Sequence, residues 1–257
     1  MSNGDKMNEY LKNLNRIEFV VTMACTGRCK HCSQGEHKIS ENIDKNIAAD
    51  AVRKIAEEYK IKSVMTFGGE PLLCPEAVCE IHKTAKELNI EQRQLITNGY
   101  FSKNSEKIKI VAQKIIECGV NEILLSVDAF HQETIPLEYV VEFAKAVNTA
   151  KINLKVQPAW LVSPDDDNPY NRKTKEILSV FNRMGIVSNE GNVIFPSGNA
   201  LKYLGEYFDL SKKFENPYDE NPNDIRAICF SANGDILGGN IYENDICDIL
   251  SNYKPKG

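Results

Sequence analysis

Three cysteines lie close together near the amino end of the chain, in the stretch CTGRCKHC. Cys25 and Cys29 are separated by three residues, and Cys29 and Cys32 by two. One short loop can therefore bring three thiols to a single metal centre. Structural zinc sites and iron–sulfur cubes held by protein alone each use four ligands. Three thiols leave one coordination position open, and in metal enzymes substrate or cosubstrate binds at such a position.

The elements that must position this loop alternate along the chain. Segments rich in β-branched and aromatic residues predict strands, and segments with helical apolar spacing predict helices. The predicted strands are residues 16–22, 61–67, 92–97, 121–127, 153–161 and 187–195. The predicted helices are residues 46–59, 75–88, 105–118, 137–150 and 173–184. Repeats of about 30 residues indicate parallel strands joined by right-handed crossovers.

A barrel and a doubly wound sheet both fit this alternation. The residues of unusual chemistry follow the carboxyl ends of several strands, where the ligand-binding mouth of a barrel lies. An open doubly wound sheet would concentrate them at one switch point instead. We therefore predict an α/β fold, a partial (β/α)6 TIM-like barrel with a small C-terminal extension. The predicted divisions are an N-terminal arm (1–14), the barrel (15–198) and a cap (199–257), in which residues 227–242 form a hairpin that turns at Asn233-Gly234.

Composition narrows the class of protein. The chain has 257 residues, of which 42% are hydrophobic and 26% charged, as in ordinary globular proteins. A net charge of -5 argues against nucleic acid as a partner. The sequence shows neither a signal-peptide pattern nor an apolar run of the ~20 residues that span a membrane. Eight cysteines without a secretory signal favour a reducing compartment, so we expect a cytoplasmic protein without a membrane partner.

The cysteine loop and a second motif together resemble the radical S-adenosylmethionine (radical SAM) enzyme superfamily. The pattern CxxxCxxC follows the first predicted strand, and Gly68-Gly69-Glu70-Pro71 follows the second. The resemblance covers roughly residues 15–198. It implies that Cys25, Cys29 and Cys32 hold a [4Fe–4S] cluster whose fourth iron is chelated by S-adenosylmethionine. Reductive cleavage of this cosubstrate gives a 5′-deoxyadenosyl radical. The alternative is a zinc site completed by His31 or His37.

The resemblance also implies roles for further residues. Gly68 and Gly69 allow close approach to the methionyl group and Glu70 contacts its ammonium, although the three could form a simple tight turn. The remaining cofactor-binding candidates are His31 against the adenine, Asn98 and Ser126 at the ribose and carboxylate, and Asp128 and Gln157 at strand ends. The alternatives are packing of the loop for His31 and a β-turn for Asn98. For Asp128, with the nearby His131, and for Gln157, bracing of the loops is the alternative.

Two cysteines near the carboxyl end form a separate pattern. The stretch from Cys229 resembles the start of the cluster-binding extension called SPASM, or twitch when shortened. Gly238, Gly239 and Asn240 occupy the positions where further cysteines would follow. Cys229 and Cys247 cannot complete a second cubane, so we predict a degenerate extension. A sharper hypothesis makes Cys229 or Cys247 a catalytic hydrogen-atom donor.

The sequence thus predicts a radical SAM enzyme that abstracts hydrogen from a peptide or an amino-acid-derived small molecule. An electron donor such as flavodoxin or ferredoxin is the expected partner. The alternatives are a glycyl-radical activase and a non-catalytic iron–sulfur sensor or scaffold protein. The sequence does not identify the substrate.

Overall fold

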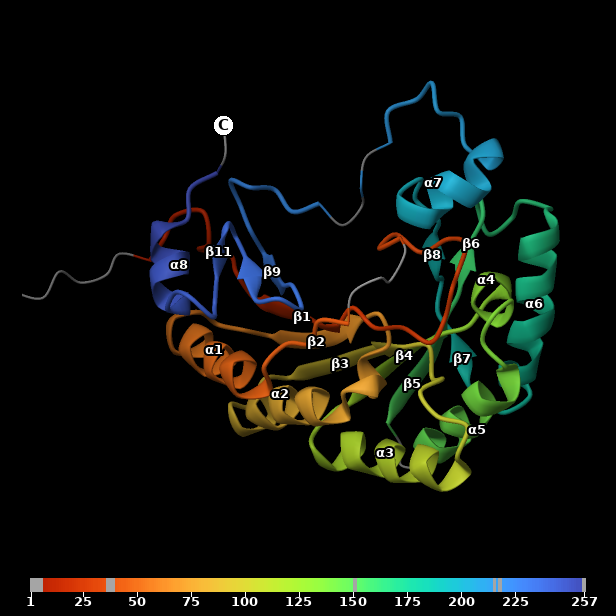
Figure 1. Ribbon diagram of the computed structural model, residues 1–257, viewed down its shortest axis with the longest axis horizontal. Coiled ribbons are helices and arrows are strands. Elements are labelled where there is room, and N and C mark those ends of the chain that lie inside the picture. Colours follow the sequence, from red (N-terminus) through yellow and green to blue (C-terminus); the bar gives the residue numbers. More distant parts are fainter. Residues whose placement is uncertain (1–6, 36–39, 150–151, 215, 217–218, 256–257) are drawn as a thin grey trace, which may run out of the picture.

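The structure is a computed structural model that describes residues 7–35, 40–149, 152–214, 216 and 219–255. Its centre is a seven-stranded sheet (Figure 1). The strands are β1 (Arg16–Thr22), β2 (Ser63–Gly68), β3 (Gln92–Thr97), β4 (Glu122–Ser126), β5 (Asn153–Gln157), β7 (Val187–Ser188) and β9 (Ala227–Phe230). They lie in the order β7-β5-β4-β3-β2-β1-β9, and every neighbouring pair is parallel.

Helices cover one face of the sheet, which we call the outer face. Figure 1 shows α1, α2, α3 and α5 side by side below the strands. Their bounds, with that of α6, are α1 (Lys45–Glu58), α2 (Pro75–Glu87), α3 (Ser105–Glu117), α5 (Leu137–Asn148) and α6 (Pro169–Asn182). Alternate strand residues such as Phe19, Leu95 and Ile123 are fully buried on the outer face. This arrangement confirms the predicted α/β partial barrel, whose two edges are β7 and β9.

Two of the predicted strands are interrupted. The predicted strand 153–161 ends as β5 at Gln157, and after Pro158, which has no N–H to donate to a sheet, β6 (Ala159–Trp160) pairs with β8 (Asn192–Val193). The predicted strand 187–195 is likewise divided into β7 and β8. Gly191 between them has φ +75°, and a Cβ there would lie 2.3 Å from the Pro158 carbonyl oxygen. The two breaks lie against each other, and the Asn192 N–H donates to the Pro158 carbonyl at 2.9 Å.

The C-terminal segment differs most from the prediction. Asn233 and Gly234 form a turn as expected, and the Ser231 N–H donates to the Asp235 carbonyl at 2.9 Å. The strand before this turn is nevertheless not half of a free hairpin, because β9 pairs in parallel with β1. The antiparallel hairpin is the short pair β10 (Asp235–Ile236) and β11 (Gly239–Asn240). Phe230 stacks on Phe19 with ring centroids 4.7 Å apart, which holds β9 in the main sheet.

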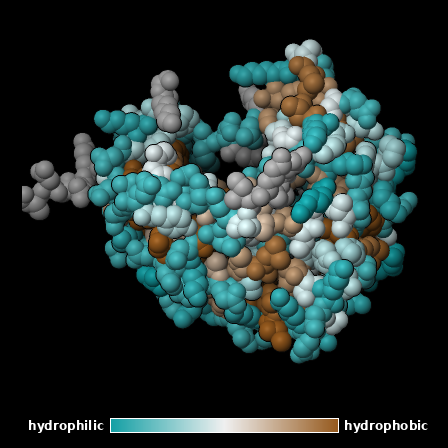
Figure 2. Space-filling model, in the orientation of Figure 1, coloured by the Kyte–Doolittle hydropathy of each residue, from teal (hydrophilic) through white to brown (hydrophobic). Residues whose placement is uncertain are grey.

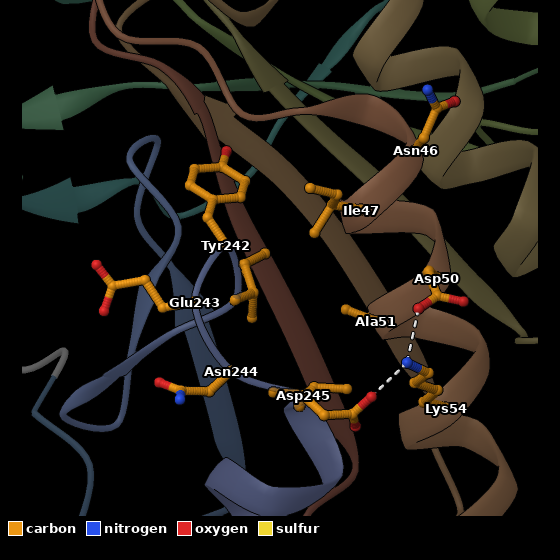
Figure 3. Close-up of a pocket in the computed structure, with 11 residues that line it drawn as sticks. Asn46, Ile47, Asp50, Ala51, Lys54, Tyr242, Glu243, Asn244 and Asp245 are labelled. Atoms are coloured by element: carbon orange, nitrogen blue, oxygen red, sulfur yellow. Dashed lines mark hydrogen bonds and ion pairs between the residues drawn. The ribbon is translucent and has the colours of Figure 1, made fainter.

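The chain ends in helix α8 (Ile246–Asn252), which packs on α1. Figure 3 shows Lys54 of α1 between Asp50 and Asp245, with its Nζ 2.9 Å and 2.6 Å from their carboxylate oxygens. A groove of about 480 Å³ lies there, between α1 and residues 241–246. Its lining contains none of the predicted site residues, so we regard it as the seam where the C-terminal segment docks. Asn8 Nδ2 closes the other side of this segment by donating to the Leu250 and Tyr253 carbonyls, both at 2.9 Å.

The part of the chain that the structure describes contains no helix with the length and apolar character needed to cross a membrane.

Candidate active site

The cysteine loop begins directly beside the Gly-Gly-Glu turn. The Gly69 N–H donates to the Thr22 carbonyl and the Glu70 N–H to the Ala24 carbonyl, each at 2.8 Å. A Cβ at Gly69 would lie 2.1 Å from the Ala24 oxygen, and Gly68 has φ +141°. The two glycines are therefore required by close contact between two segments of this chain. Their predicted approach to the methionyl group stays a prediction.

None of the three cysteines of the loop forms a disulfide, and Cys29 is the most enclosed, with 8% of its surface exposed. Burial raises the pKa of Cys25 to about 11. Burial also raises the pKa of Cys32, and burial together with the negative charge of Asp128 raises that of Cys29. Metal binding requires thiolates and releases these protons, so loading of the site should improve as pH rises.

Two N–H groups point at the sulfur of Cys25. The Gly27 N–H lies 3.4 Å and Asn98 Nδ2 lies 3.7 Å from Sγ, and Asn98 also donates to Thr26 Oγ1 at 3.3 Å. N–H···S bonds of this kind tune the potential of a cluster. Three cysteine side chains on one loop, with N–H donors aimed at the sulfur of one of them, fit a [4Fe–4S] cluster held by three protein ligands. Asn98, predicted at the nucleotide, thus contacts the cysteine loop itself.

Glu70 is fully buried and holds Asn98 in place. Its carboxylate accepts hydrogen bonds from Thr97 Oγ1 at 2.7 Å, the Asn98 N–H at 2.8 Å and the Leu72 N–H at 2.9 Å. Burial raises the pKa of Glu70 to about 7, against the opposite effect of these three donors. The structure therefore gives Glu70 a bracing role between β2 and β3. Its predicted contact with the methionyl ammonium of S-adenosylmethionine stays a prediction.

Asp128 is also fully buried, at the start of the short helix α4 (Ala129–Gln132). Oδ1 accepts from the Phe130 and His131 N–H groups at 3.0 and 2.9 Å. Oδ2 accepts from the Ala159 N–H at 3.0 Å and lies 2.8 Å from His131 Nδ1. Burial acts to raise the pKa of Asp128, but the charge of His131 and these hydrogen bonds outweigh it and hold the pKa well below its usual range. These four contacts engage both carboxylate oxygens of Asp128 within the protein. They support the alternative that Asp128 braces the loops.

His31 turns from the cysteine loop toward α4. Its ring centroid lies 5.1 Å from that of Phe130 and 4.7 Å from that of His131. Burial lowers the pKa of His31 to about 4, and its enclosed Nδ1 has no hydrogen-bond partner within the described residues. A neutral imidazole with an unpaired ring nitrogen can form a hydrogen bond to a bound ligand. The predicted contact of His31 with adenine stays a prediction.

The zinc alternative also has a possible donor set. One ligand atom each from Cys29, His31 and His131 lie within 4.8 Å of one another. His37, the other histidine considered for zinc, lies outside the described residues. Metal analysis of the purified protein separates zinc from an iron–sulfur cluster.

Polar side chains continue along the neighbouring strand ends. Ser126 of β4 and Gln157 of β5 are directly opposed in the sheet. Asn189 Nδ2, which follows β7, donates to Gln157 Oε1 at 3.1 Å. Ser188 Oγ is buried without a partner in the described part of the chain. The sequence singled out Ser126 and Gln157 but missed Ser188 and Asn189, because the break at Gly191 moved the end of that strand.

The sequence also did not predict the contact between Asn199 and the cysteine loop. Asn199, in helix α7 (Gly198–Leu204), is 8% exposed, and its N–H donates to the Cys32 carbonyl at 2.9 Å. Its Nδ2 donates to the carbonyls of Cys29 at 3.2 Å and Gly35 at 3.3 Å. Gly198 has φ +50°, and a Cβ there would lie 2.5 Å from the Ser33 carbonyl. The only signal in the sequence is the turn-forming run Pro196-Ser-Gly-Asn.

Replacing Asn199 with alanine should loosen the cysteine loop without unfolding the protein. Two side-chain hydrogen bonds of about 0.5–1.5 kcal/mol each are lost, so the loop should open about tenfold more often. Hydrogen exchange of residues 25–35 in the metal-free protein measures this opening, and iron per chain after anaerobic reconstitution should fall. The exposed Asn182→Ala is the control. If residues 25–35 of Asn199→Ala exchanged at the wild-type rate, the Asn199 side chain would have no role in holding the cysteine loop.

The two C-terminal cysteines lie on opposite faces of the sheet. Cys229 of β9 is opposed to Glu18 of β1, on the face away from the helices. Cys229 is exposed as a residue, but desolvation of its sulfur and the charge of Glu18 raise the pKa of the thiol to about 12. Cys247 is in α8, where burial and Asp245 raise its pKa to about 11. Since α8 packs on α1 at the outer face, the donor hypothesis remains only for Cys229, and the two thiols do not converge on one centre.

Comparison with known proteins agrees with this site. The radical SAM superfamily profile matches residues 19–157, more than half of the chain. A probable GTP 3′,8-cyclase of Methanocaldococcus jannaschii is 27% identical over 125 residues, 48% of this chain and 39% of that protein. A probable GTP 3′,8-cyclase of Methanococcus aeolicus is 27% identical over 194 residues, 68% of this chain and 61% of that protein. The chain thus matches less than two thirds of the length of each of these relatives.

Solved structures agree on the fold. Streptococcus suis SuiB bound to S-adenosylmethionine aligns with a TM-score of 0.60 and 14% identity, over 94% of this chain and 66% of that one. The protein anSMEcpe with bound AdoMet aligns with a TM-score of 0.59 and 12% identity, over 93% and 80% of the two chains. The three-cysteine loop, the adjoining Gly-Gly-Glu turn, the parallel sheet and the profile match lead to one conclusion. The chain belongs to the radical SAM superfamily, whose members bind a [4Fe–4S] cluster and S-adenosylmethionine.

Proposed function

We propose that this protein cleaves S-adenosylmethionine reductively and abstracts a hydrogen atom from a peptide or amino-acid-derived substrate. The observation that carries the proposal is the loop of three cysteines, none of them in a disulfide, directly beside the Gly-Gly-Glu turn. When bound, the cluster supplies an electron and an open iron site for the cosubstrate.

The chain's own residues prepare this site. Cys25, Cys29 and Cys32 bind the metal, while Gly27 and Asn98 donate toward Cys25 Sγ. Glu70 accepts a hydrogen bond from the Asn98 N–H and so holds Asn98 in place. Asn199 binds the cysteine loop through the Cys29 carbonyl. Enclosure of Cys29 limits access of water and oxygen to the metal. A small electron-transfer protein such as flavodoxin or ferredoxin would supply the electron.

Two groups of relatives support different substrates. SuiB was solved bound to the precursor peptide SuiA, and anSMEcpe was solved with a peptide. These chains share the fold, and they support a peptide substrate. The sequence relatives are named GTP 3′,8-cyclases, which supports a nucleotide as the second candidate. On the face of the sheet opposite the helices, Arg16 is paired with Glu18 and Lys155 with Glu122, and this balance of charge favours the peptide.

Anaerobic reconstitution tests the function. Protein loaded with iron and sulfide, reduced and mixed with S-adenosylmethionine should release 5′-deoxyadenosine, measured by liquid chromatography and mass spectrometry. An oxygen-exposed sample is the control. A stable cluster without cleavage, even with candidate substrates added, would instead indicate a sensor or scaffold. A glycyl radical formed on an added partner protein would indicate an activase, and one bound zinc would refute the proposal.

A further inference from the structure

One row of side chains crosses the inner face of the sheet, opposite the helices. Its members are opposed pair by pair in the strand register and so point to the same face. They are Cys229, Glu18, Met65, Gln94, Glu122 and Asn153, on β9, β1, β2, β3, β4 and β5 in turn. We call these six residues the inner row. The residue after each member faces the helices, as Phe19, Leu95 and Ile123 do.

The inner row is polar and is joined by side-chain contacts. Glu122 Oε2 accepts from Gln94 Nε2, and Oε1 accepts from Asn153 Nδ2 at 2.8 Å and Lys155 Nζ at 3.1 Å. At the other end Arg16 pairs with Glu18, and its Nη2 lies 3.2 Å from Met65 Sδ. Arg16 and Lys155 are each two residues from a row member, so both reach back into the row from the same face.

Polar residues are unusual in this place. The interior of a closed barrel is filled by branched apolar side chains, and polar groups buried there are unfavourable unless they are paired. Gln94 is only 8% exposed, and its Oε1 has no hydrogen-bond partner within the described residues. Because Nε2 is turned toward Glu122, Oε1 is turned away from it. A buried acceptor without a donor indicates a ligand that brings an N–H or O–H group.

The two ends of the inner row are partly exposed. The side chains of Glu18, Arg16 and Lys155 are 22%, 32% and 39% exposed. In the space-filling view the surface is notched between the lobe of the C-terminal segment and the lobe that carries α7 (Figure 2). A strand rises about 3.3 Å per residue, so the row lies about 10–13 Å below the residues that follow β3. Between them is an apolar layer of Val20, Phe67, Ile96 and Leu124.

The charges decide between the two substrate classes. Glu18 and Glu122 balance Arg16 and Lys155, so the row has no excess positive charge to receive a triphosphate. A peptide backbone is uncharged and carries repeated N–H donors, and three extended residues span about 10 Å. We infer that the inner row is the floor of the substrate site and that Gln94 Oε1 accepts a backbone N–H of a peptide substrate. This inference rests on the proposed function and names its substrate class.

Binding of two probes tests the inference without turnover. The probes are acetyl-Ala-Ala-Ala-amide and GTP, titrated into the whole 257-residue chain and followed by ligand-observed NMR. The tripeptide should bind and GTP should not. Gln94→Met should weaken tripeptide binding about tenfold, the value of one lost hydrogen bond of ~1.4 kcal/mol. Gln92→Met, on the same face but exposed and outside the row, should bind like wild type.

A third probe keeps the inference testable if the Gln94→Met variant does not fold. The fully N-methylated tripeptide lacks the N–H donors and should not bind to the wild type. Absence of tripeptide binding, equal binding of the methylated probe, an unchanged affinity in folded Gln94→Met, or GTP binding that Gln94→Met abolishes would each overturn the inference. Formation of 5′-deoxyadenosine is measured separately. Tripeptide binding without that cleavage would refute only the proposed function, and cleavage without binding only the inference.

Discussion

Replacing Cys29 with alanine is expected to remove the iron–sulfur cluster and reduce S-adenosylmethionine cleavage to background. Cys29 is the most enclosed of the three thiols, and two protein ligands cannot hold a cubane whose fourth iron is left for the cosubstrate. The fold should survive, because one buried sulfur contributes about 1 kcal/mol to stability. Iron and sulfide content, the absorbance of the cluster and 5′-deoxyadenosine formation measure the effect.

Cys79→Ala is the matched control for this prediction. Cys79 has the same exposed fraction, 8%, but lies on α2, outside the cysteine loop. It should keep wild-type iron content and activity while losing a similar amount of stability. If Cys29→Ala kept a full cluster, or if Cys79→Ala lost it, the assignment of the metal ligands would be wrong.

Replacing Gly69 with alanine is expected to destabilise the fold and displace the cysteine loop. The added Cβ would lie 2.1 Å from the Ala24 carbonyl oxygen, so the two backbones must separate. That separation breaks the bonds from the Gly69 and Glu70 N–H groups to the start of the loop. Overpacking of this kind lowers the free energy of unfolding by about 3 kcal/mol or more. Urea unfolding of the metal-free protein measures it, and iron uptake should fall in parallel.

Gly205 offers the matched glycine. It has φ -55°, and a Cβ there would meet no atom within 4 Å. Gly205→Ala should therefore be neutral or stabilise the protein by up to about 1 kcal/mol through the unfolded chain. Equal unfolding curves for Gly69→Ala and Gly205→Ala would show that the Gly-Gly-Glu turn can accommodate a Cβ at residue 69. That result would contradict the prediction.

Local patterns in the sequence were sufficient to predict the parallel α/β fold and to propose the metal ligands. Cys25, Cys29 and Cys32 lie on one loop, so their spacing alone indicates that they can converge on one metal centre. The apolar periodicity of segments such as 46–59 and 105–118 reflects one buried helix face, which is also a local property. The sequence assigned Gly68 and Gly69 to close approach of the methionyl group, and only the structure shows their close contact with the backbone of Thr22 and Ala24.

The tertiary structure alone decided the features that join distant segments. Parallel pairing of β9 with β1 and the grip of Asn199 on the cysteine loop connect residues roughly two hundred positions apart. The polarity of the inner row becomes visible only when the register of six strands is known. Each of these depends on which residues are opposed across a sheet or a loop, and a local hydrophobic pattern carries no information about that. Sequence therefore determined which chemistry the chain can support, and the packing of remote segments decided what surrounds it.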